Sequence, residues 1–342
     1  MNTNNSQRAV AWWLFACCAM VFLTMVVGGV TRLTHSGLSI VEWKPLVGAL
    51  PPLSHADWLE LFAKYQQTPE FIKRNHDMTL DGFQFIFWWE WAHRLSGRLI
   101  GVVFLLPYLF FLARGYLKGA LAAKVFGFFI LGGLQGAMGW YMVKSGLVDD
   151  PRVSQYRLAA HLGLAFVLFG LMFWTGLGML QPRTAKFAVS PAPTFTHRLG
   201  NWLVALVFIM VLSGALVAGI RAGLAYNTFP LMNGHFLPPE SFMVEPWWLN
   251  FFTNMALVQF DHRLLAWALM GLIPWYSWRL WNEFPDARTP AVALTLWLAV
   301  QVVLGIATLL LQVPVALAAT HQAGAMVLFG LLIWANHAIR RA

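Results

Sequence analysis

The chain has 342 residues, of which 59% are hydrophobic, 15% aromatic and only 11% charged. A soluble protein could not bury that much apolar surface, so the composition excludes a soluble domain and indicates a membrane protein. The net charge of +9 does not predict a nucleic-acid-binding protein, because the basic residues stand singly at the ends of apolar runs. The only cysteines, Cys17 and Cys18, are adjacent, so they cannot link distant loops through disulfides.

Apolar runs of the length that spans a membrane, about 20 residues, recur along the whole chain. The first is too long for the core of a signal peptide and predicts a retained helix. The runs lie at 9–30, 86–112, 121–143, 158–180, 200–221, 254–280, 291–312 and 318–339. The sequence therefore predicts an all-α integral membrane protein with eight transmembrane helices. The two longest links, 31–85 and 222–253, are expected to be structured loops on the same side.

Lysine and arginine residues in the short links predict the orientation of the chain, because such residues favour the cytoplasmic side. Those on the side of Arg8 are Arg114, Lys118, Lys124, Arg183, Lys186, Arg279, Arg288, Arg340 and Arg341. The opposite short links carry fewer basic residues, which are balanced by Asp149 and Asp150. Both termini are therefore expected in the cytoplasm, and the two long loops outside.

The sequence contains an internal repeat. His161 is followed by LGLAFVLFG and His321 by QAGAMVLFG, and EWAHRL at 90–95 matches QFDHRL at 259–264. These matches predict two similar four-helix halves, residues 1–181 and 182–342. Four helices is an even number, so both halves run in the same direction and are expected to be related by a pseudo-two-fold axis along the membrane normal.

Four of the ten histidines, His93, His161, His262 and His321, stand near the starts of the second, fourth, sixth and eighth predicted helices. A lone histidine in an apolar helix is most often a hydrogen-bonded core residue, but four at matched positions of a repeat favour ligands. Zinc sites bring three or four donors to one point, whereas two facing imidazoles in each bundle suit haem iron, which already has four equatorial donors.

Glycines and arginines near these histidines permit two interpretations each. Small residues make room for a flat macrocycle or allow helices to pack closely. The glycines concerned are Gly97, Gly101, Gly132, Gly133, Gly136, Gly139, Gly163, Gly305 and Gly324. Arg94, Arg98 and Arg263 either bind haem propionates or extend to the membrane interface.

The two halves differ in two acidic residues beside the histidines. Asp261 takes the place of Ala92 and is expected to orient either a neighbour or a propionate-binding arginine. The other difference is at Glu90. Glu90 stands three residues before His93, on the same helix face, whereas Gln259 holds the matching place before His262. An amide cannot exchange a proton at neutral pH, so the difference suggests proton-coupled chemistry in the first half and a permanent redox cofactor in the second. The alternative is that Glu90 simply pairs with Arg94 or another arginine.

Three segments resemble the haem A synthase family, particularly its alphaproteobacterial and mitochondrial branch. They are SGLSIVEWKPLVGALPP (36–52), YQQTPEFIKRNHDMTL (65–80) and FQFIFWWEWAHRLSGR (83–98), and DHRL and THQ support the resemblance in the second half. The resemblance implies an enzyme of the bacterial inner membrane that oxidises the C8 methyl group of haem O to a formyl group, giving haem A for terminal oxidases. Branches with paired cysteines in the outer loops are not matched, which excludes a loop-disulfide mechanism.

The resemblance also implies the ligands. Haem b is expected between His262 and His321, and the substrate haem between His93 and His161, with Glu90 as the functional glutamate. The implied partners are haem O, haem O synthase, membrane lipid and an electron donor, either quinol or ferredoxin; a homo-oligomer is compatible with the sequence. The rival interpretations are a di-haem b electron-transfer protein, without chemistry on haem, and a transporter built on parallel repeats.

Overall fold

The computed structural model describes residues 3–43, 47–147, 153–180 and 194–340. Several positions used above lie outside these residues: Asp149, Asp150, Arg183, Lys186, Arg341 and the expected boundary between the halves at 181 and 182. The described residues form helices and turns, with one isolated bridge between Met232 and His235.

Eight of the described helices are long and apolar enough to cross a membrane, which confirms the predicted number. They are α1 (Thr3–Leu33), α4 (Leu80–Ala113), α5 (Gly119–Gly146), α6 (Gln155–Leu180), α7 (Phe195–Gly219), α9 (Met255–Glu283), α10 (Arg288–Leu310) and α11 (Val315–Ile339). Most extend beyond the apolar runs, and polar side chains cap the starts of α4 and α9, whereas α5, α7, α10 and α11 begin without a side-chain cap. The side chains of Thr79 and Asn254, for example, accept hydrogen bonds from the first backbone amides of α4 and α9.

Both long links are structured, as expected. The first contains η1 (Val47–Ala49), α2 (His55–Gln66) and α3 (Pro69–Arg74), and the second contains η3 (Ala222–Leu224), η4 (Pro239–Phe242), η5 (Trp247–Leu249) and α8 (Asn250–Thr253). A short η6 (Pro285–Ala287) joins α9 to α10. Ser54 and Asp57 form a capping box at the start of α2, and Thr68 caps α3 ahead of a proline at its first position.

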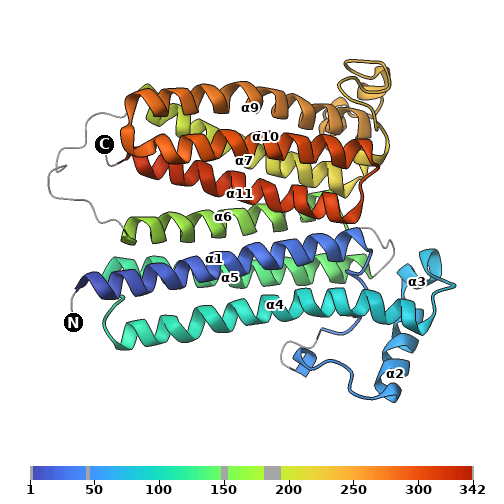
Figure 1. The fold of residues 1–342 in the computed structure, drawn as a ribbon. Helices are drawn as coiled ribbons and strands as arrows, with labels where there is room; N and C mark the ends of the chain where they lie inside the picture. The colour runs from blue at the N-terminus through green and yellow to red at the C-terminus, as the bar shows by residue number, and fades with distance from the viewer. Residues whose placement is uncertain (1–2, 44–46, 148–152, 181–193, 341–342) are drawn as a thin grey trace.

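The long helices contact one another in two rings. In the N-terminal ring, α1 packs on α4 and α6, and α5 packs on α4 and α6; in the C-terminal ring, α7 packs on α9 and α11, and α10 packs on α9 and α11. The rings meet where α6 packs on α7 and where α11 packs on both α1 and α6 (Figure 1). One buried apolar core runs through both rings.

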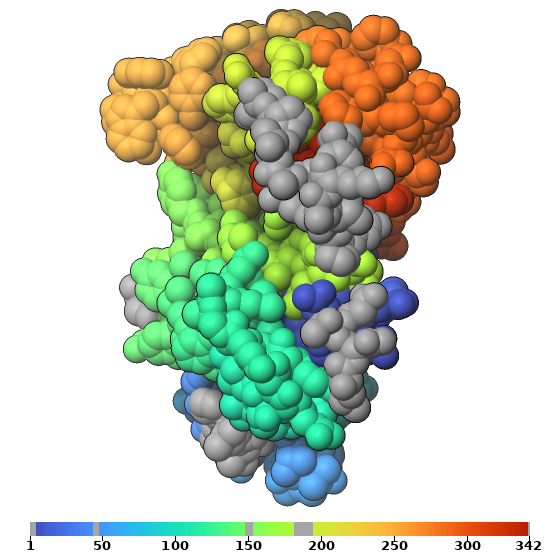
Figure 2. All heavy atoms as spheres, turned by 90° about the vertical axis from the view of Figure 1, so that its left-hand side faces the viewer, coloured from blue at the N-terminus to red at the C-terminus, as the bar shows by residue number. Residues whose placement is uncertain are grey.

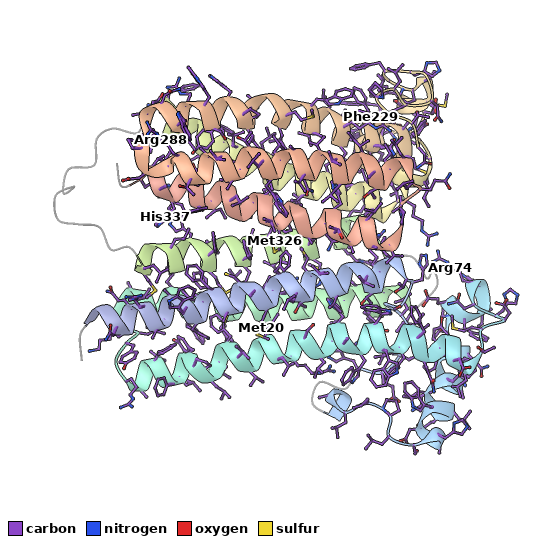
Figure 3. The ribbon with its side chains drawn as sticks, viewed as in Figure 1. Met20, Arg74, Phe229, Arg288, Met326 and His337 are labelled. Carbon is purple, nitrogen blue, oxygen red and sulfur yellow. The ribbon has the colours of Figure 1, made fainter. Side chains whose placement is uncertain are left out.

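The loops gather at one end of the molecule. The segments with α2 and α3 and the connection between α7 and α9 lie at the end that we call the loop end, opposite the start of α1 and the end of α11 (Figure 1). Arg74 and Phe229 lie at the loop end, and Arg288 and His337 lie at the other, which we call the terminal end (Figure 3). Figure 2 looks onto the terminal end, where the α4–α5 connection (blue-green) and the start of α10 (orange) lie far apart.

The loop segment with α2 and α3 has its own small aromatic core. Tyr65, Phe83, Ile86 and Phe87 are buried there, and Trp58, Phe62 and Phe71 pack around them. Because Phe83 and Ile86 belong to the first turns of α4, this core fixes the loop segment on the end of a transmembrane helix.

Single cysteines should report the two ends separately, since both native cysteines are buried. We expect Ala56→Cys and Met243→Cys to react with a membrane-impermeant maleimide from the same face, and Lys118→Cys to react from the opposite face. All three positions are exposed, so accessibility is decided by the membrane alone. Labelling of Ala56→Cys and Met243→Cys from opposite faces would contradict the shared loop end.

Candidate functional site

The four histidines singled out in the sequence lie at equivalent places. His93 is on α4, His161 on α6, His262 on α9 and His321 on α11, each in the half of its helix nearer the loop end. Within each ring, the two histidine-bearing helices are the ones that the ring places opposite each other, with a helix between them on either side. Each ring therefore contributes two partly buried imidazoles from opposite walls.

Each imidazole lies against a glycine of a neighbouring helix. A Cβ atom added to Gly28 on α1 would lie 2.5 Å from Cε1 of His93, and one added to Gly305 on α10 would lie 2.9 Å from Cε1 of His321. Gly139 on α5 and Gly214 on α7 stand in the same relation to the other two imidazoles, at 3.2 and 3.1 Å. A side chain at these positions would displace the ring, so the glycines are needed where the helices approach the imidazoles.

Two glutamines connect α6 and α11, one histidine-bearing helix of each ring, to a neighbouring helix. Nε2 of Gln135 on α5 donates to the backbone oxygen of His161 at 3.0 Å, and Nε2 of Gln301 on α10 donates to that of His321 at 2.9 Å. The same amides lie 3.4 and 3.2 Å from a ring nitrogen of each histidine. The sequence analysis missed this pair, although each glutamine stands four residues before the glycine that faces the imidazole.

The donor sets suit haem better than a structural metal ion. Among the described residues, no three His, Cys, Asp or Glu side chains come together as a metal site, whereas structural zinc requires four donors. Two imidazoles from opposite helices are the axial set that haem iron takes in membrane bundles. Nδ1 of His161 is buried without a hydrogen-bond partner. The imidazole of His161 therefore has an unused nitrogen.

Glu90 and Arg94 form a buried clamp between α4 and the loop. Arg94 donates to Oε1 of Glu90 through Nη2 at 2.6 Å and through Nε at 3.0 Å. The other carboxylate oxygen accepts from Oγ of Ser39 at 2.7 Å and from the amide of Ile40 at 2.8 Å. Arg94 also donates to the backbone oxygens of Ile40 and Glu42. Glu90 thus pairs with Arg94, the alternative that the sequence left open, and the pair ties the loop to the helix.

The C-terminal ring repeats this clamp with a neutral partner. Nη2 of Arg263 donates to Oε1 of Gln259 at 3.2 Å, and Nε2 of Gln259 donates to the backbone oxygen of Ala222 at 2.9 Å. Arg263 also donates to the backbone oxygens of Tyr226 and Pro230. The first clamp is an ion pair, whereas the second carries the charge of an arginine without a carboxylate within the clamp.

Two of the three arginines predicted to bind propionates contact the loops. Arg94 and Arg263 direct donors at loop carbonyl groups, and Arg98 lies one turn further along α4, partly buried. Binding of propionates by these three arginines stays a prediction.

The two rings also differ in how closely their neighbouring helices pack. The contact between α4 and α5 is smaller than its counterpart between α9 and α10. A Cβ atom added to any of five glycines on α4 and α5 would meet no other atom within 4 Å; they are Gly97, Gly101, Gly132, Gly133 and Gly136. Gly163 and Gly324, in contrast, allow close approach of Leu212 and Gln301. Close packing, one of the two sequence interpretations, is therefore seen at Gly163 and Gly324, and room for a macrocycle at the other glycines stays a prediction.

Comparison with known proteins identifies the family. Residues 11–333 match the family model described as cytochrome oxidase assembly protein. The chain belongs to this family. It is 59% identical to a protein named heme A synthase from Nitrosospira multiformis, over 98% of this chain and 94% of that protein. Proteins of the same name from Nitrosomonas eutropha and Parvibaculum lavamentivorans are 52% and 46% identical, over 96% and 99% of this chain and 93% and 96% of theirs. The predicted resemblance is thereby confirmed, and the relatives include betaproteobacterial as well as alphaproteobacterial proteins.

Removing one partner of the Glu90–Arg94 pair should destabilise the protein more than removing both partners. Arg94→Gln leaves the carboxylate of Glu90, whose side chain is 2% exposed, without its cation, and such a loss destabilises proteins by about 3–5 kcal/mol. The double variant Glu90→Gln, Arg94→Gln leaves no buried charge and should recover part of this loss. Thermal unfolding in detergent and hydrogen exchange of residues 39–43 measure both effects. Equal melting temperatures for the single and double variants would contradict the energetic coupling of the pair.

Proposed function

We propose that this chain is a haem A synthase, an oxidoreductase that converts haem O into haem A for terminal oxidases by oxidising the C8 methyl group to a formyl group. The observation that carries the proposal is the pairing of four glycine-backed histidines in two rings, within a chain of this family. Haem, when bound, supplies the iron redox chemistry that oxidation of a methyl group needs.

The C-terminal ring is the proposed site of a permanent haem b, held by His262 and His321. Its clamp holds the neutral amide of Gln259 in the place that Glu90 has in the N-terminal ring, although another carboxyl group, Asp261, directly precedes His262. Arg263 adds a positive charge at the loop end, where the propionates of the cofactor would be recognised. The tighter contact between α9 and α10 supports retention of a resident cofactor.

The N-terminal ring is the proposed substrate site, where His93 and His161 hold the substrate haem. The smaller contact between α4 and α5, together with the glycines that face open space, supports exchange of a substrate with the surrounding lipid. Arg94 directly follows His93 on α4, and Arg98 lies one turn further from the loop end. In this proposal both arginines orient the substrate through its carboxylates.

Glu90 supplies the protonatable group beside the substrate ligands in this proposal. Its carboxylate is held by Arg94 and by the amide of Ile40, so its position relative to α4 is fixed before any substrate binds. Such preorganisation keeps a proton acceptor at a constant place on the histidine-bearing helix.

We further propose that residues 1–181 and 182–342 are two halves related by a pseudo-two-fold axis along the membrane normal, in a bacterial inner membrane with the loop end outside and both termini cytoplasmic. The basic residues of the short terminal-end links, such as Arg114, Lys118, Arg279 and Arg288, support this orientation. Haem O synthase is the proposed source of substrate, and quinol or ferredoxin the source of electrons.

Histidine variants should separate the permanent haem from the substrate site. Changing His262 or His321 to Ala is expected to abolish or shift the low-spin haem b spectrum of the purified protein, because an axial ligand is lost. His93→Ala should leave most of that spectrum. The opposite pattern would mean that the two rings have exchanged roles, and two permanent haems with no haem A formed would favour an electron-transfer protein.

Glu90→Gln tests the proton-exchanging role without removing the clamp. Gln259 accepts one hydrogen bond from Arg263 in the matching place, so an amide at position 90 should keep part of the clamp, and the variant should fold with lowered stability and keep its haem b. We expect conversion of haem O to fall by about a hundredfold or more, the usual contribution of a general acid or base. The measurement is haem A formed per molecule loaded with haem b, and wild-type turnover would remove Glu90 from the mechanism.

A further inference from the structure

Glu70 is a buried carboxyl group outside the transmembrane helices. It lies on α3 at the loop end, one turn before Arg74 (Figure 3), and is only 3% exposed. Its Oε2 atom is buried without a hydrogen-bond partner. A carboxylate in such a place is unfavourable because it has lost water without gaining a donor. Burial, and then the negative charge of Glu90, raise the pKa of Glu70 to about 8, although Arg74 opposes the shift. Glu70 is therefore mostly protonated at neutral pH.

The aromatic core around Tyr65 brings the surroundings of the two carboxyl groups together, because Phe71, which follows Glu70, and Ile40, whose amide donates to Glu90, both pack against it. This buried phenol on α2 accepts a hydrogen bond from Nδ2 of Asn75 at 2.7 Å. Burial and the charges of Glu70 and Glu90 raise the pKa of Tyr65 to about 12. The phenol consequently stays neutral, and the charged groups near Glu70 include Arg74 and Glu90, the latter paired with Arg94.

The two glutamates are held very differently. Glu90 accepts hydrogen bonds from Arg94, Ser39 and Ile40, which together occupy both of its oxygens. Glu70 leaves Oε2 without any donor. One carboxyl group is thus arranged to carry a negative charge, and its neighbour is arranged to hold a proton.

A surface groove lies at the start of α3 and along the loop segment that contacts Arg94. It has a volume of about 340 Å³ and is lined by Val41, Glu42, Lys64, Gln67, Thr68, Pro69 and Leu147. Thr68 and Pro69 immediately precede Glu70 in the chain. Glu42 receives a hydrogen bond from Arg94 through its backbone oxygen and pairs with Lys64 through its side chain at 2.9 Å. The groove therefore reaches the solvent side of the clamp and the start of the helix that carries Glu70.

We propose that Glu70 is the proton-transfer group between Glu90 and the loop-end surface. It exchanges one proton with the carboxylate of Glu90 on one side and with water in the groove on the other, and no electrons move in either step. Glu70 does not touch the substrate, so it acts through Glu90. This inference rests on the proposed function, in which the N-terminal ring is the substrate site.

The test compares Glu70→Gln with Glu60→Gln in the full-length, haem-b-loaded protein. Glutamine has the shape and the neutral charge of the protonated Glu70 but cannot release a proton. Glu60 is an exposed glutamate on α2 that pairs with Lys64, so its variant controls for loss of an acid from the same loop. The two readouts are haem A formed as a function of pH, and the infrared carbonyl band of protonated carboxyl groups.

We expect Glu70→Gln to lower turnover by about tenfold to a hundredfold and to remove the limb of the pH profile near pH 8, while Glu60→Gln leaves both unchanged. The infrared spectrum of the wild type should contain a carboxyl band that titrates near pH 8, is missing in Glu70→Gln and titrates at lower pH in Glu90→Gln. Wild-type turnover and pH profile in Glu70→Gln, or no loss of the band, would overturn the proposal.

The infrared titration needs no turnover, so it separates the two hypotheses. A wild-type protein that forms no haem A would overturn the proposed function, while the band would still decide whether Glu70 holds the proton beside Glu90.

Discussion

In each ring, one buried arginine needs hydrogen-bond partners at the edge of the membrane, and the structure around it depends on those hydrogen bonds. Arg94 and Arg263 each stand one residue after a histidine, at a depth where an unpaired charge is costly. Each donates to the side chain four residues earlier and to carbonyl oxygens of the loop that precedes its helix, although Nε of Arg263 is buried without a partner. The loop backbone is thereby held against the helix that presents the imidazole. The position of each first histidine and the shape of each loop are consequences of the same set of hydrogen bonds.

The same clamp gives the two rings different electrostatics. Glu90 neutralises Arg94 within the N-terminal clamp, whereas Gln259 supplies no charge to balance Arg263 within the C-terminal clamp. A site with a net positive charge retains an anionic cofactor, and a site whose arginine is already paired holds such a ligand less strongly. Together with the smaller contact between α4 and α5, this difference supports the proposed retention of a cofactor in the C-terminal ring and the proposed exchange of substrate in the N-terminal ring.

Hydropathy was sufficient to predict the eight transmembrane helices, because each must be apolar over the thickness of the membrane. Their ends were less predictable, since α4 begins at the Thr79 cap among residues that belong to the loop core. The internal repeat exposed the four histidines and the contrast between Glu90 and Gln259. It did not expose Gln135 and Gln301, because a single polar residue in an apolar run acquires meaning only when the neighbouring helix is known.

Glu70 illustrates the limit of sequence reasoning more sharply. In the sequence it is one of several acids in a polar segment, and nothing local distinguishes it from Glu60. The difference arises because the loop packs against Phe83 and Ile86 of α4 in an aromatic core. This packing buries Glu70, whereas Glu60 remains exposed to water. Burial disfavours the charged form of Glu70, and the nearby carboxylate of Glu90 adds to this effect, so Glu70 keeps its proton to higher pH than an exposed glutamate does. A protonatable group at the loop end thus follows from how the loop is anchored: the contacts that fasten the loop over the first histidine also create the place where a proton is held.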